Sequence, residues 1–301
     1  MKIIKKRNFA IKLFLMLFAL SSLHVMAQRA PAEFSVNAAG GISTYCFAPS
    51  SKTSSSIGYS SDFGIGFTGF INQQFGINVG VGFGLFNVKS KISELKTVTS
   101  GFSTYDSEGR LQRYNLHTTL SGYTEIHKSL FLNIPVMLQF QTQQKQYWSW
   151  KQSPKANFYA MGGLKLLFLF NNKYEANVQS LSNIAEFFEL GSSAGTQTFV
   201  DLGKFDNGYM NSGTMEFGVM AMFAFEMGAK WWLGNNVCVY TGVFFDCGLN
   251  DPIKDSRKSY AKYINEENLE DFAILKVSDR TNLMVVGIKL RLAISKLQRR
   301  Y

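Results

Sequence analysis

Cysteine and histidine are scarce in this chain, and its apolar runs are short. There are three residues of each type among 301, and after the N-terminus no apolar run approaches the roughly 20 residues that a membrane-spanning helix requires. An odd number of cysteines cannot all pair with one another, and no Cys-x-x-Cys pair or metal-ligand spacing occurs. These absences argue against a helical membrane protein, a disulfide framework and a metal centre, so we predict no metal-binding residues.

Motifs for nucleotides and nucleic acids are also missing. No phosphate-binding loop is present, and the many Gly-x-Gly pairs lie within alternating apolar patterns rather than between a strand and a helix. Lysines and arginines do not form a dense tract with interleaved aromatic residues. We therefore expect no nucleic-acid partner and no cofactor, and the sequence identifies no small-molecule substrate.

The N-terminus has the composition of an export signal. Four basic residues between positions 2 and 7 precede an apolar segment at 9–20, and Val25-Met26-Ala27 forms a small-residue cleavage site. We predict a signal peptide at 1–27 and an outer-membrane domain at 28–301; a retained anchor is the alternative. Removal of the signal takes five basic residues and no acid, which lowers the formal net charge from +10 to +5. The remaining positive charge suits acidic lipid head groups.

Residues 63–88 show the pattern around which the rest of the chain is organised. Bulky apolar residues occupy every second position on both sides of residues 72–74, and most of the positions between them are glycine. A period of two is typical of a strand whose two faces meet different surroundings. In a membrane barrel the bulky face contacts lipid, while small and polar residues face a narrow lumen. We therefore predict a transmembrane β-hairpin with a tight turn at 72–74.

The same alternation recurs along the chain and predicts further strands. The predicted strands are residues 33–45, 63–71, 75–88, 130–140, 158–170, 215–227, 237–245 and 282–294. Their connections are mostly short on one side and mostly long on the other, which is the asymmetry expected of outer-membrane barrels. The predicted fold is all-β, an eight-stranded antiparallel up-and-down transmembrane barrel with long extracellular loops. The predicted location is the bacterial outer membrane.

Polar stretches at residues 89–128, 171–212 and 249–280 are predicted to be the long outer loops. Part of the first, 113–124, alternates weakly, which favours an extension of the flanking strands beyond the membrane. Part of the second, 181–190, is predicted to form a short amphipathic helix. The acidic residues of the third loop are interpreted as a solvated face rather than a calcium site. They are Glu266, Glu267, Glu270 and Asp271.

An eight-stranded barrel is narrow enough to be filled by its own side chains, so we predict a closed lumen. Charges of both signs are predicted to face it, and buried charges require partners or water. We expect Arg291 and Lys289 to contact acidic groups such as Glu226, in a structural network rather than an ion path. The predicted inward charged residues are Asp62, Lys165, Glu216, Glu226, Asp246, Lys289 and Arg291.

The cysteines and one proline lie within predicted strands. By strand parity, Cys46 and Cys247 face lipid near the outer rim, and Cys238 faces the lumen near the inner rim. They are interpreted as buried thiols that act as small hydrophobes, with a Cys46–Cys247 bridge as the alternative. Pro135 removes one ladder donor, which predicts a bulge or a locally unpaired carbonyl in the fourth strand.

His127 and Ser129 form the one short motif that points to chemistry. Their His-x-Ser spacing, with Glu125 nearby, is similar to the active-site motif of outer-membrane lipid A deacylases, in which His and Ser attack an acyl ester. Strand parity places both side chains on the lumen side, where a lipid substrate does not reach them. We therefore predict no catalytic residues, and a lipid-modifying enzyme that uses His127 and Ser129 is the second alternative.

Residues 131–140 read Phe-Leu-Asn-Ile-Pro-Val-Met-Leu-Gln-Phe. This segment resembles the Leu-Glu-Ile-Pro-Leu-Leu-Leu-Lys-Tyr segment of the PorT-like outer-membrane β-barrel family of Bacteroidota. Gln28 and the Gly162-Gly163 pair are similar too, whereas Asn133 stands where the family usually has glutamate. The resemblance covers residues 34–295 and implies a small barrel of the OmpA/OmpX type. Because the family includes a component of type IX secretion, the resemblance also makes a secretion-associated role an expectation.

The function predicted from the sequence is a structural, adhesive or secretion-associated role. We expect it to be carried by the outer loops or by contacts with protein partners in the outer membrane or periplasm, because loops on a rigid scaffold carry much of protein recognition. Outer-membrane lipid is the other expected partner. A small-solute porin is the first alternative.

Overall fold

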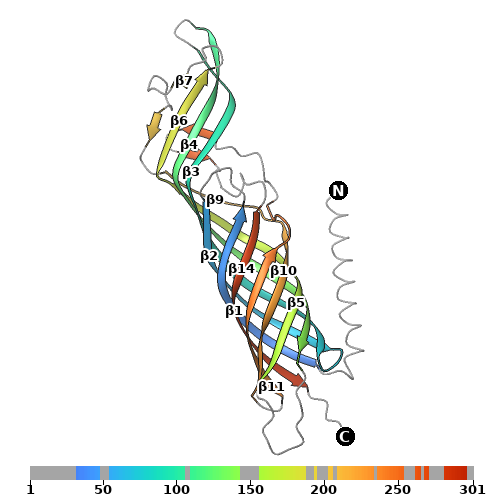
Figure 1. Cartoon of the computed structure of the whole chain (residues 1–301). Coiled ribbons are helices and arrows are strands. Elements are labelled where there is room, and N and C mark those ends of the chain that lie inside the picture. The colour runs from blue at the N-terminus through green and yellow to red at the C-terminus, as the bar shows by residue number, and fades with distance from the viewer. Residues whose placement is uncertain are drawn as a thin grey trace, which may run out of the picture.

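The computed structural model describes residues 32–47, 54–105, 109–142, 156–187, 193–194, 203–205, 209–233, 236–253, 262–265, 268–270 and 281–296. The elements among these residues are all strands (Figure 1). None of these residues form a helix with the length and apolar character needed to cross a membrane. The predicted signal peptide, residues 1–27, lies outside the described residues.

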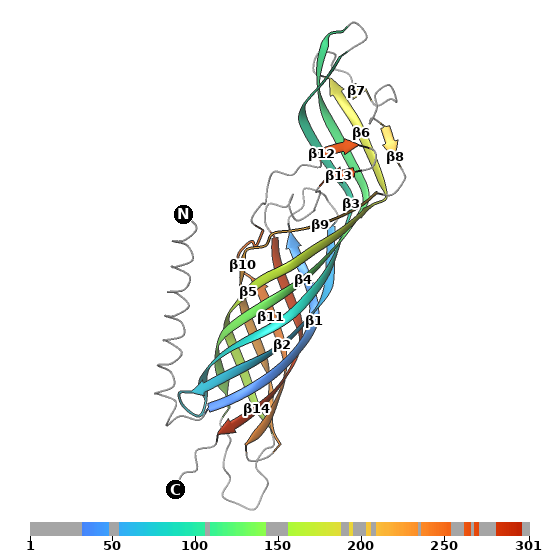
Figure 2. The ribbon, with the colours of Figure 1, turned by 180° about the vertical axis from the view of Figure 1, so that it is seen from behind.

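Strands from the whole length of the chain close into one antiparallel ring. The ring follows β1, β2, β3, β4, β5, β10, β11 and β14, and β14 pairs again with β1. These strands are β1 (Ala32–Phe47), β2 (Ser54–Phe70), β3 (Phe75–Tyr105), β4 (Leu111–Gln141), β5 (Ala156–Val178), β10 (Val219–Trp232), β11 (Val237–Gly248) and β14 (Thr281–Lys296). The predicted eight-stranded antiparallel barrel is confirmed, and Figures 1 and 2 show it from opposite sides.

The outer surface of the barrel is apolar on every strand of the ring. One exposed apolar side chain from each strand illustrates the band: Phe34, Phe63, Phe83, Leu138, Leu164, Phe223, Val243 and Ile288. A soluble protein would bury such residues, whereas a closed barrel leaves no unpaired sheet edge and presents them to lipid. The protein is therefore an integral outer-membrane β-barrel, as the alternation predicted.

Glycines on the inner face of β3 allow side chains of β4 to enter the lumen. A Cβ atom added at Gly84 would lie 2.5 Å from Cζ of Phe131, and one added at Gly82 would lie 2.8 Å from Nδ2 of Asn133. Contacts that short do not occur, so any larger residue would displace these side chains. At Gly82 the missing side chain leaves room for Asn133, and at Gly84 it leaves room for Phe131 and for the backbone oxygen of Ser61, which would lie 2.3 Å from the added Cβ.

The turn and the proline behave as predicted. The backbone N–H groups of Gln74 and Phe75 donate to Oδ1 of Asn72 at 2.8 and 2.7 Å, which closes the tight turn between β2 and β3. Around Pro135, the β3–β4 ladder loses its pairs between Val79 and Gly82 and resumes in the same register. The proline therefore interrupts the pairing locally, without a bulge.

The predicted outer loop at 89–128 is wrong for most of its length. β3 and β4 have 31 residues each and pair with one another almost to their ends. A tilted strand needs only about 9–11 residues to cross a bilayer, so both strands continue far beyond it. Their outer parts are too polar to resemble membrane strands, and only the weak alternation at 113–124 indicated the extension.

The predicted helix at 181–190 is also wrong, because β6 (Ser180–Phe187) is a strand. It pairs with β4 over Tyr114 to Ser121, and its buried residues alternate: Leu181, Asn183, Ala185 and Phe187. Short strands β7 (Ser193–Ala194) and β8 (Gly203–Phe205) pair with β6 in turn. We use the name blade for residues 93–105 of β3, 111–123 of β4 and all of β6, which rise from one side of the barrel (Figures 1 and 2).

The other two predicted loops also contain strands. β5 continues to Val178, and its outer end pairs with β9 (Tyr209–Thr214). Within 249–280, β12 (Lys262–Asn265) and β13 (Asn268–Glu270) form a small separate hairpin. Glu266, Glu267 and Asp271 lie outside the described residues.

The parity of the sixth predicted strand is wrong at its start. Met215 and Phe217 are buried and Glu216 is exposed, the reverse of the prediction. Residues between β9 and β10 do not form a regular strand, apart from a bridge between Phe217 and Ile253. The alternation is therefore broken there and resumes in the predicted sense from Val219, which is exposed.

The cysteines face the predicted sides. Cys238 is buried in the lumen, as interpreted, whereas Cys46 is exposed and Cys247 is half-buried on the outer face, so the interpretation of all three as buried thiols is wrong for these two. All three are free thiols, so the alternative of a Cys46–Cys247 bridge is wrong. Sγ of Cys46 instead lies 3.1 Å from Sδ of Met284 on the neighbouring strand.

Candidate functional site

The inner end of the lumen is closed by an ion pair with polar partners. Nζ of Lys230 on β10 donates to Oε1 of Glu33 on β1 at 2.6 Å and to Oε1 of Gln141 at 3.1 Å. The hydroxyl of Tyr240 donates to the other carboxylate oxygen of Glu33 at 2.5 Å. Both charged side chains are almost completely buried, and the contact between them joins β1 and β10, which are separated in the ring by β14 and β11.

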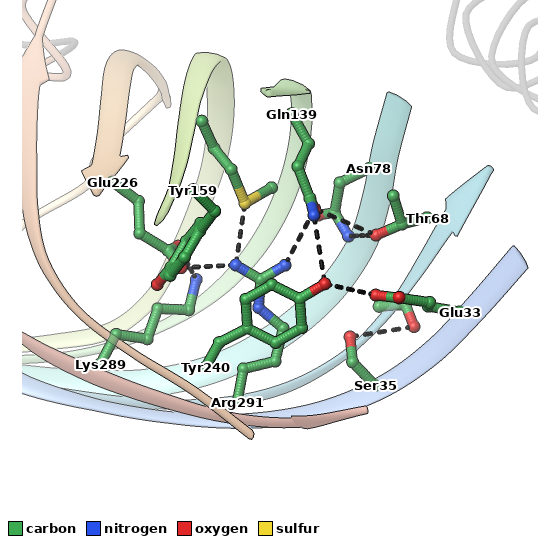
Figure 3. Close-up of polar contacts among 12 residues, drawn as sticks. Glu33, Ser35, Thr68, Asn78, Gln139, Tyr159, Glu226, Tyr240, Lys289 and Arg291 are labelled. Carbon is green, nitrogen blue, oxygen red and sulfur yellow. Dashed lines mark hydrogen bonds and ion pairs between the residues drawn. The ribbon is translucent and has the colours of Figure 1, made fainter. Parts of the chain in front are cut away.

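A second cluster lies immediately outward of the first (Figure 3). The carboxylate of Glu226 accepts from Nη2 of Arg291 at 2.5 Å and from the hydroxyl of Tyr159 at 2.8 Å, and Nζ of Lys289 lies 3.0 Å from it. Arg291 also donates to Oε1 of Gln139 at 3.4 Å. The predicted contact of Arg291 and Lys289 with Glu226 is confirmed.

Aromatic rings fill the space around these charges. The rings of Tyr159 and Tyr240 meet edge to face with centroids 4.9 Å apart. The guanidinium of Arg291 lies 4.5 Å from the centroid of Tyr240, and the ammonium of Lys230 lies 4.4 Å from that of Trp232. Cation–π contacts of this kind stabilise a buried cation beyond its ion pair.

Further outward, Lys165 pairs with Asp246, with Nζ and Oδ2 2.5 Å apart. Asn133 donates to Oδ2 of Asp62 at 2.9 Å. Above them lies a cluster of buried apolar residues that includes Phe86 and others on the lumen side. Every charged residue predicted to face inward is thus placed in the lumen, apart from Glu216.

Small cavities lie among the described lumen side chains, and two of them border the buried charges. Each has a volume of about 20 Å³ for the centres of water-sized spheres, which is room for about one or two waters. One is lined by Lys165, Asp246 and apolar side chains, and the other by Arg291 and the glycine-rich face of β2 and β3. These are packing voids between paired charges, and they are too small for a solute of the size that a porin carries.

His127 and Ser129 lie inside the barrel, as parity predicted. Both are buried, and Nε2 of His127 lies against the carboxylate of the buried Glu125. The ring of Tyr45 stands edge-on to His127, with centroids 5.8 Å apart. The motif therefore faces packed side chains rather than the lipid surface, where a lipid acyl ester would be located.

The prediction missed several members of the lumen network. Glu33 and Lys230 were not among the predicted inward charges, and no contact was predicted for Gln139, Tyr159 or Tyr240, although all five lie on the inward faces of their strands. Counting in twos from Glu226 reaches Lys230, so parity alone identifies the facing side. Which residues meet across the lumen depends on the register of strands far apart in sequence.

The blade has its own packed face. The rings of Tyr114 on β4 and Phe187 on β6 have centroids 5.3 Å apart, and Phe102 on β3 stacks on Tyr114. A hydroxyl of Thr118 donates to Oδ1 of Asn183 at 2.9 Å, and both residues are buried. These side-chain contacts join β3 to β4 and β4 to β6, so the three strands of the blade form one sheet.

The end of the blade exposes apolar side chains. Tyr105 and Leu111 are directly paired beside the end of the β3–β4 hairpin, and they are 68% and 49% exposed. These two residues lie far from the lipid band, so contact with lipid does not explain their exposure.

Among the described residues, no group of three or more histidine, cysteine or acidic side chains is arranged to hold a metal ion.

Comparisons with known proteins find similar solved structures only. No family model and no curated protein matches the chain. Neisserial surface protein A is similar over 86% of this chain and 95% of its own, at 9% identity and a TM-score of 0.30. Ail, the attachment invasion locus protein of Yersinia pestis, has 10% identity over 89% and 99%, with a TM-score of 0.29. OprG from Pseudomonas aeruginosa has 8% identity over 89% and 97%, with a TM-score of 0.35.

Proposed function

We propose that this protein is a non-conducting outer-membrane barrel that holds the blade outside the cell for contact with another protein. The role is structural, adhesive or secretion-associated, and the blade rather than the lumen carries it. The observation on which this depends is the length of β3 and β4, which are 31 residues each. About 9–11 residues are enough for a strand to cross the membrane, so about two thirds of each strand lies beyond what crossing requires.

The lumen supports the same proposal, because its packing argues against transport of solutes through the barrel. Its buried charges are paired inside the barrel, and each pair joins strands that are not neighbours in the ring: Glu226 and Arg291 are separated by one strand, and Lys230 and Glu33 by two. Opening a path for a solute would leave such charges without partners, at a cost of several kcal/mol each. A network of this kind makes the barrel a rigid base.

The outer end of the blade supports a protein contact. Tyr105 and Leu111 offer adjacent apolar surface on a strand pair that is held in place by the packing of Tyr114 and Phe187. Exposed apolar patches with polar surroundings mark sites of protein interaction, and tyrosine is enriched at such sites. The secretion-associated form of the proposal predicts a partner in the export machinery, and the adhesive form predicts a partner on another cell.

Two experiments test the proposal. Purified protein in planar lipid bilayers is expected to give no steady single-channel steps, and regular channels would show that it is a porin. A photo-crosslinking residue at Tyr105 is expected to capture one protein on intact cells, and the adduct is expected to disappear when Leu111 is changed to serine. The same residue at Leu138, in the lipid-facing band, is the control. An identical adduct from both positions would contradict a role for the blade.

A further inference from the structure

A group of lysines lies where the apolar band ends on one side of the barrel. On β3, β4 and β5 the outward apolar residues fall within residues 75–85, 130–140 and 158–170. The first charged outward residues beyond them are Lys89, Lys128 and Lys173, and Lys91 follows on β3. All four side chains are exposed, at the level where lipid head groups meet water.

Strand pairing brings these lysines together. Lys128 is directly opposite Lys173 in the β4–β5 ladder, and Lys89 is diagonal to Lys128 because Lys128 pairs with Asn87. Directly opposite residues have Cβ atoms about 5 Å apart and diagonal ones about 7–8 Å, so the ammonium groups can converge on one anion. Like charges placed opposite one another destabilise a sheet, which an anion between them would offset.

The charges of this group are not balanced within the described residues. Glu175 accepts from Lys128 at 2.8 Å, and no ion pair or hydrogen bond joins the side chains of Lys89, Lys91 or Lys173 to any other described residue. The exposed lysines at this level lie on β3, β4 and β5, on one side of the barrel. Near the outer ends of β1, β11 and β14 the outward positions hold uncharged residues: Cys46, Cys247 and Met284.

We propose that Lys89, Lys91, Lys128 and Lys173 form a binding site for the phosphate of an anionic lipid in the outer leaflet. The apolar band directly below would contact the acyl chains of the same lipid, while the ammonium groups contact its head group. Because the site lies at the base of the blade, the bound lipid would also fix how the blade leans over the membrane. The proposal does not depend on what the blade binds.

The test compares lipid binding by four forms of the full-length mature protein in detergent micelles, with native mass spectrometry as the measurement. The probes are dioleoylphosphatidylglycerol and dioleoylphosphatidylcholine, which share acyl chains and differ in net charge. The wild-type protein is expected to bind the anionic lipid at least tenfold more tightly. Changing all four lysines to glutamine is expected to abolish the preference.

Two variants separate charge from structure. Replacing the four lysines with arginine is expected to keep the preference, because the charge is retained. Lys96→Gln removes a lysine of the blade that already pairs with Glu94 at 3.2 Å, and it is expected to change nothing. If the quadruple glutamine variant does not fold, Lys173→Gln alone is expected to weaken binding about fivefold. Equal binding of the two lipids by the wild-type protein, or an unchanged preference in the glutamine variant, would overturn the proposal.

Discussion

At the scale of single residues, the lumen shows how charges are tolerated inside a narrow barrel. Glu226 holds two cations, Arg291 and Lys289, and its side chain is 2% exposed. The low polarisability of the packed lumen strengthens such contacts and makes an unpaired charge costly. The stability of the barrel is therefore expected to fall sharply when one partner of a buried pair is removed, even if the intact pair itself contributes little.

Glu226→Ala is expected to lower the free energy of unfolding by about 3–5 kcal/mol, because it leaves two cations buried without a carboxylate. Denaturant unfolding in lipid vesicles measures the change. Glu94→Ala is the control, since it breaks the exposed pair with Lys96 and is expected to cost less than about 1 kcal/mol. Similar losses from both variants would show that the lumen pairs are not required.

Gly84→Ala is expected to destabilise the barrel by about 1–3 kcal/mol, because the added Cβ would lie 2.3 Å from the backbone oxygen of Ser61 and 2.5 Å from Cζ of Phe131. Gly40→Ala is the matched control on the lipid-facing side, where the nearest atom would be 4.0 Å away. The same unfolding measurement compares them. If the two substitutions cost the same, the close contacts at Gly84 do not require glycine.

At the scale of elements, β6 shows that a local pattern does not determine secondary structure when a partner strand is available. Residues 181–190 carry apolar side chains that fit a helix as well as a strand over so short a length. β4 extends far enough to offer an unpaired edge, and β6 fills it from Tyr114 to Ser121. The backbone hydrogen bonds of that ladder favour the strand.

The pairing of β4 and β6 makes a prediction about cross-linking. After the three native cysteines are replaced by alanine, cysteines at Thr119 and Ser182, which are directly opposite, are expected to react rapidly with a short thiol cross-linker. Cysteines at Thr119 and Asn183 are expected to react slowly, because adjacent residues of a strand point to opposite faces. Equal rates, measured by gel mobility after proteolysis between the strands, would favour a helix or a different register.

At the scale of the whole molecule, the polarity of the outward side chains divides the protein into a membrane part and an outer part. Residues such as Ile288 on β14 present an apolar band to lipid, whereas the blade is mixed in polarity. The cost of a charge therefore depends on its position along the barrel axis, since the bilayer offers it neither water nor counter-ions.

Ile288→Arg is expected to lower the free energy of unfolding by about 2–4 kcal/mol, because this residue lies near the middle of the apolar band. Val98→Arg, at a similarly exposed apolar residue on the blade, is expected to cost less than about 0.5 kcal/mol. Unfolding in vesicles of phosphatidylcholine gives both values. A small cost at Ile288 would place the membrane elsewhere on the protein.

The sequence by itself determined the barrel, its strands and the side that each strand turns to lipid. Alternation is a local property, because every second side chain of a strand points the same way, and lipid on one side with a narrow lumen on the other selects bulky and small residues accordingly. Parity therefore placed Cys238, His127 and most of the lumen charges correctly. It failed at Glu216, where the strand is interrupted.

Only the tertiary structure decided which lumen charges meet and how far the strands extend. Glu33 and Lys230 are separated by 197 residues, and their contact depends on the closure of the ring and on the register of every strand between them. The blade likewise depends on pairing between β4 and β6, since its polar residues carry only a weak period. Contacts that arise from pairing across long sequence distances leave little local pattern, because the partner that fixes each residue lies elsewhere in the chain.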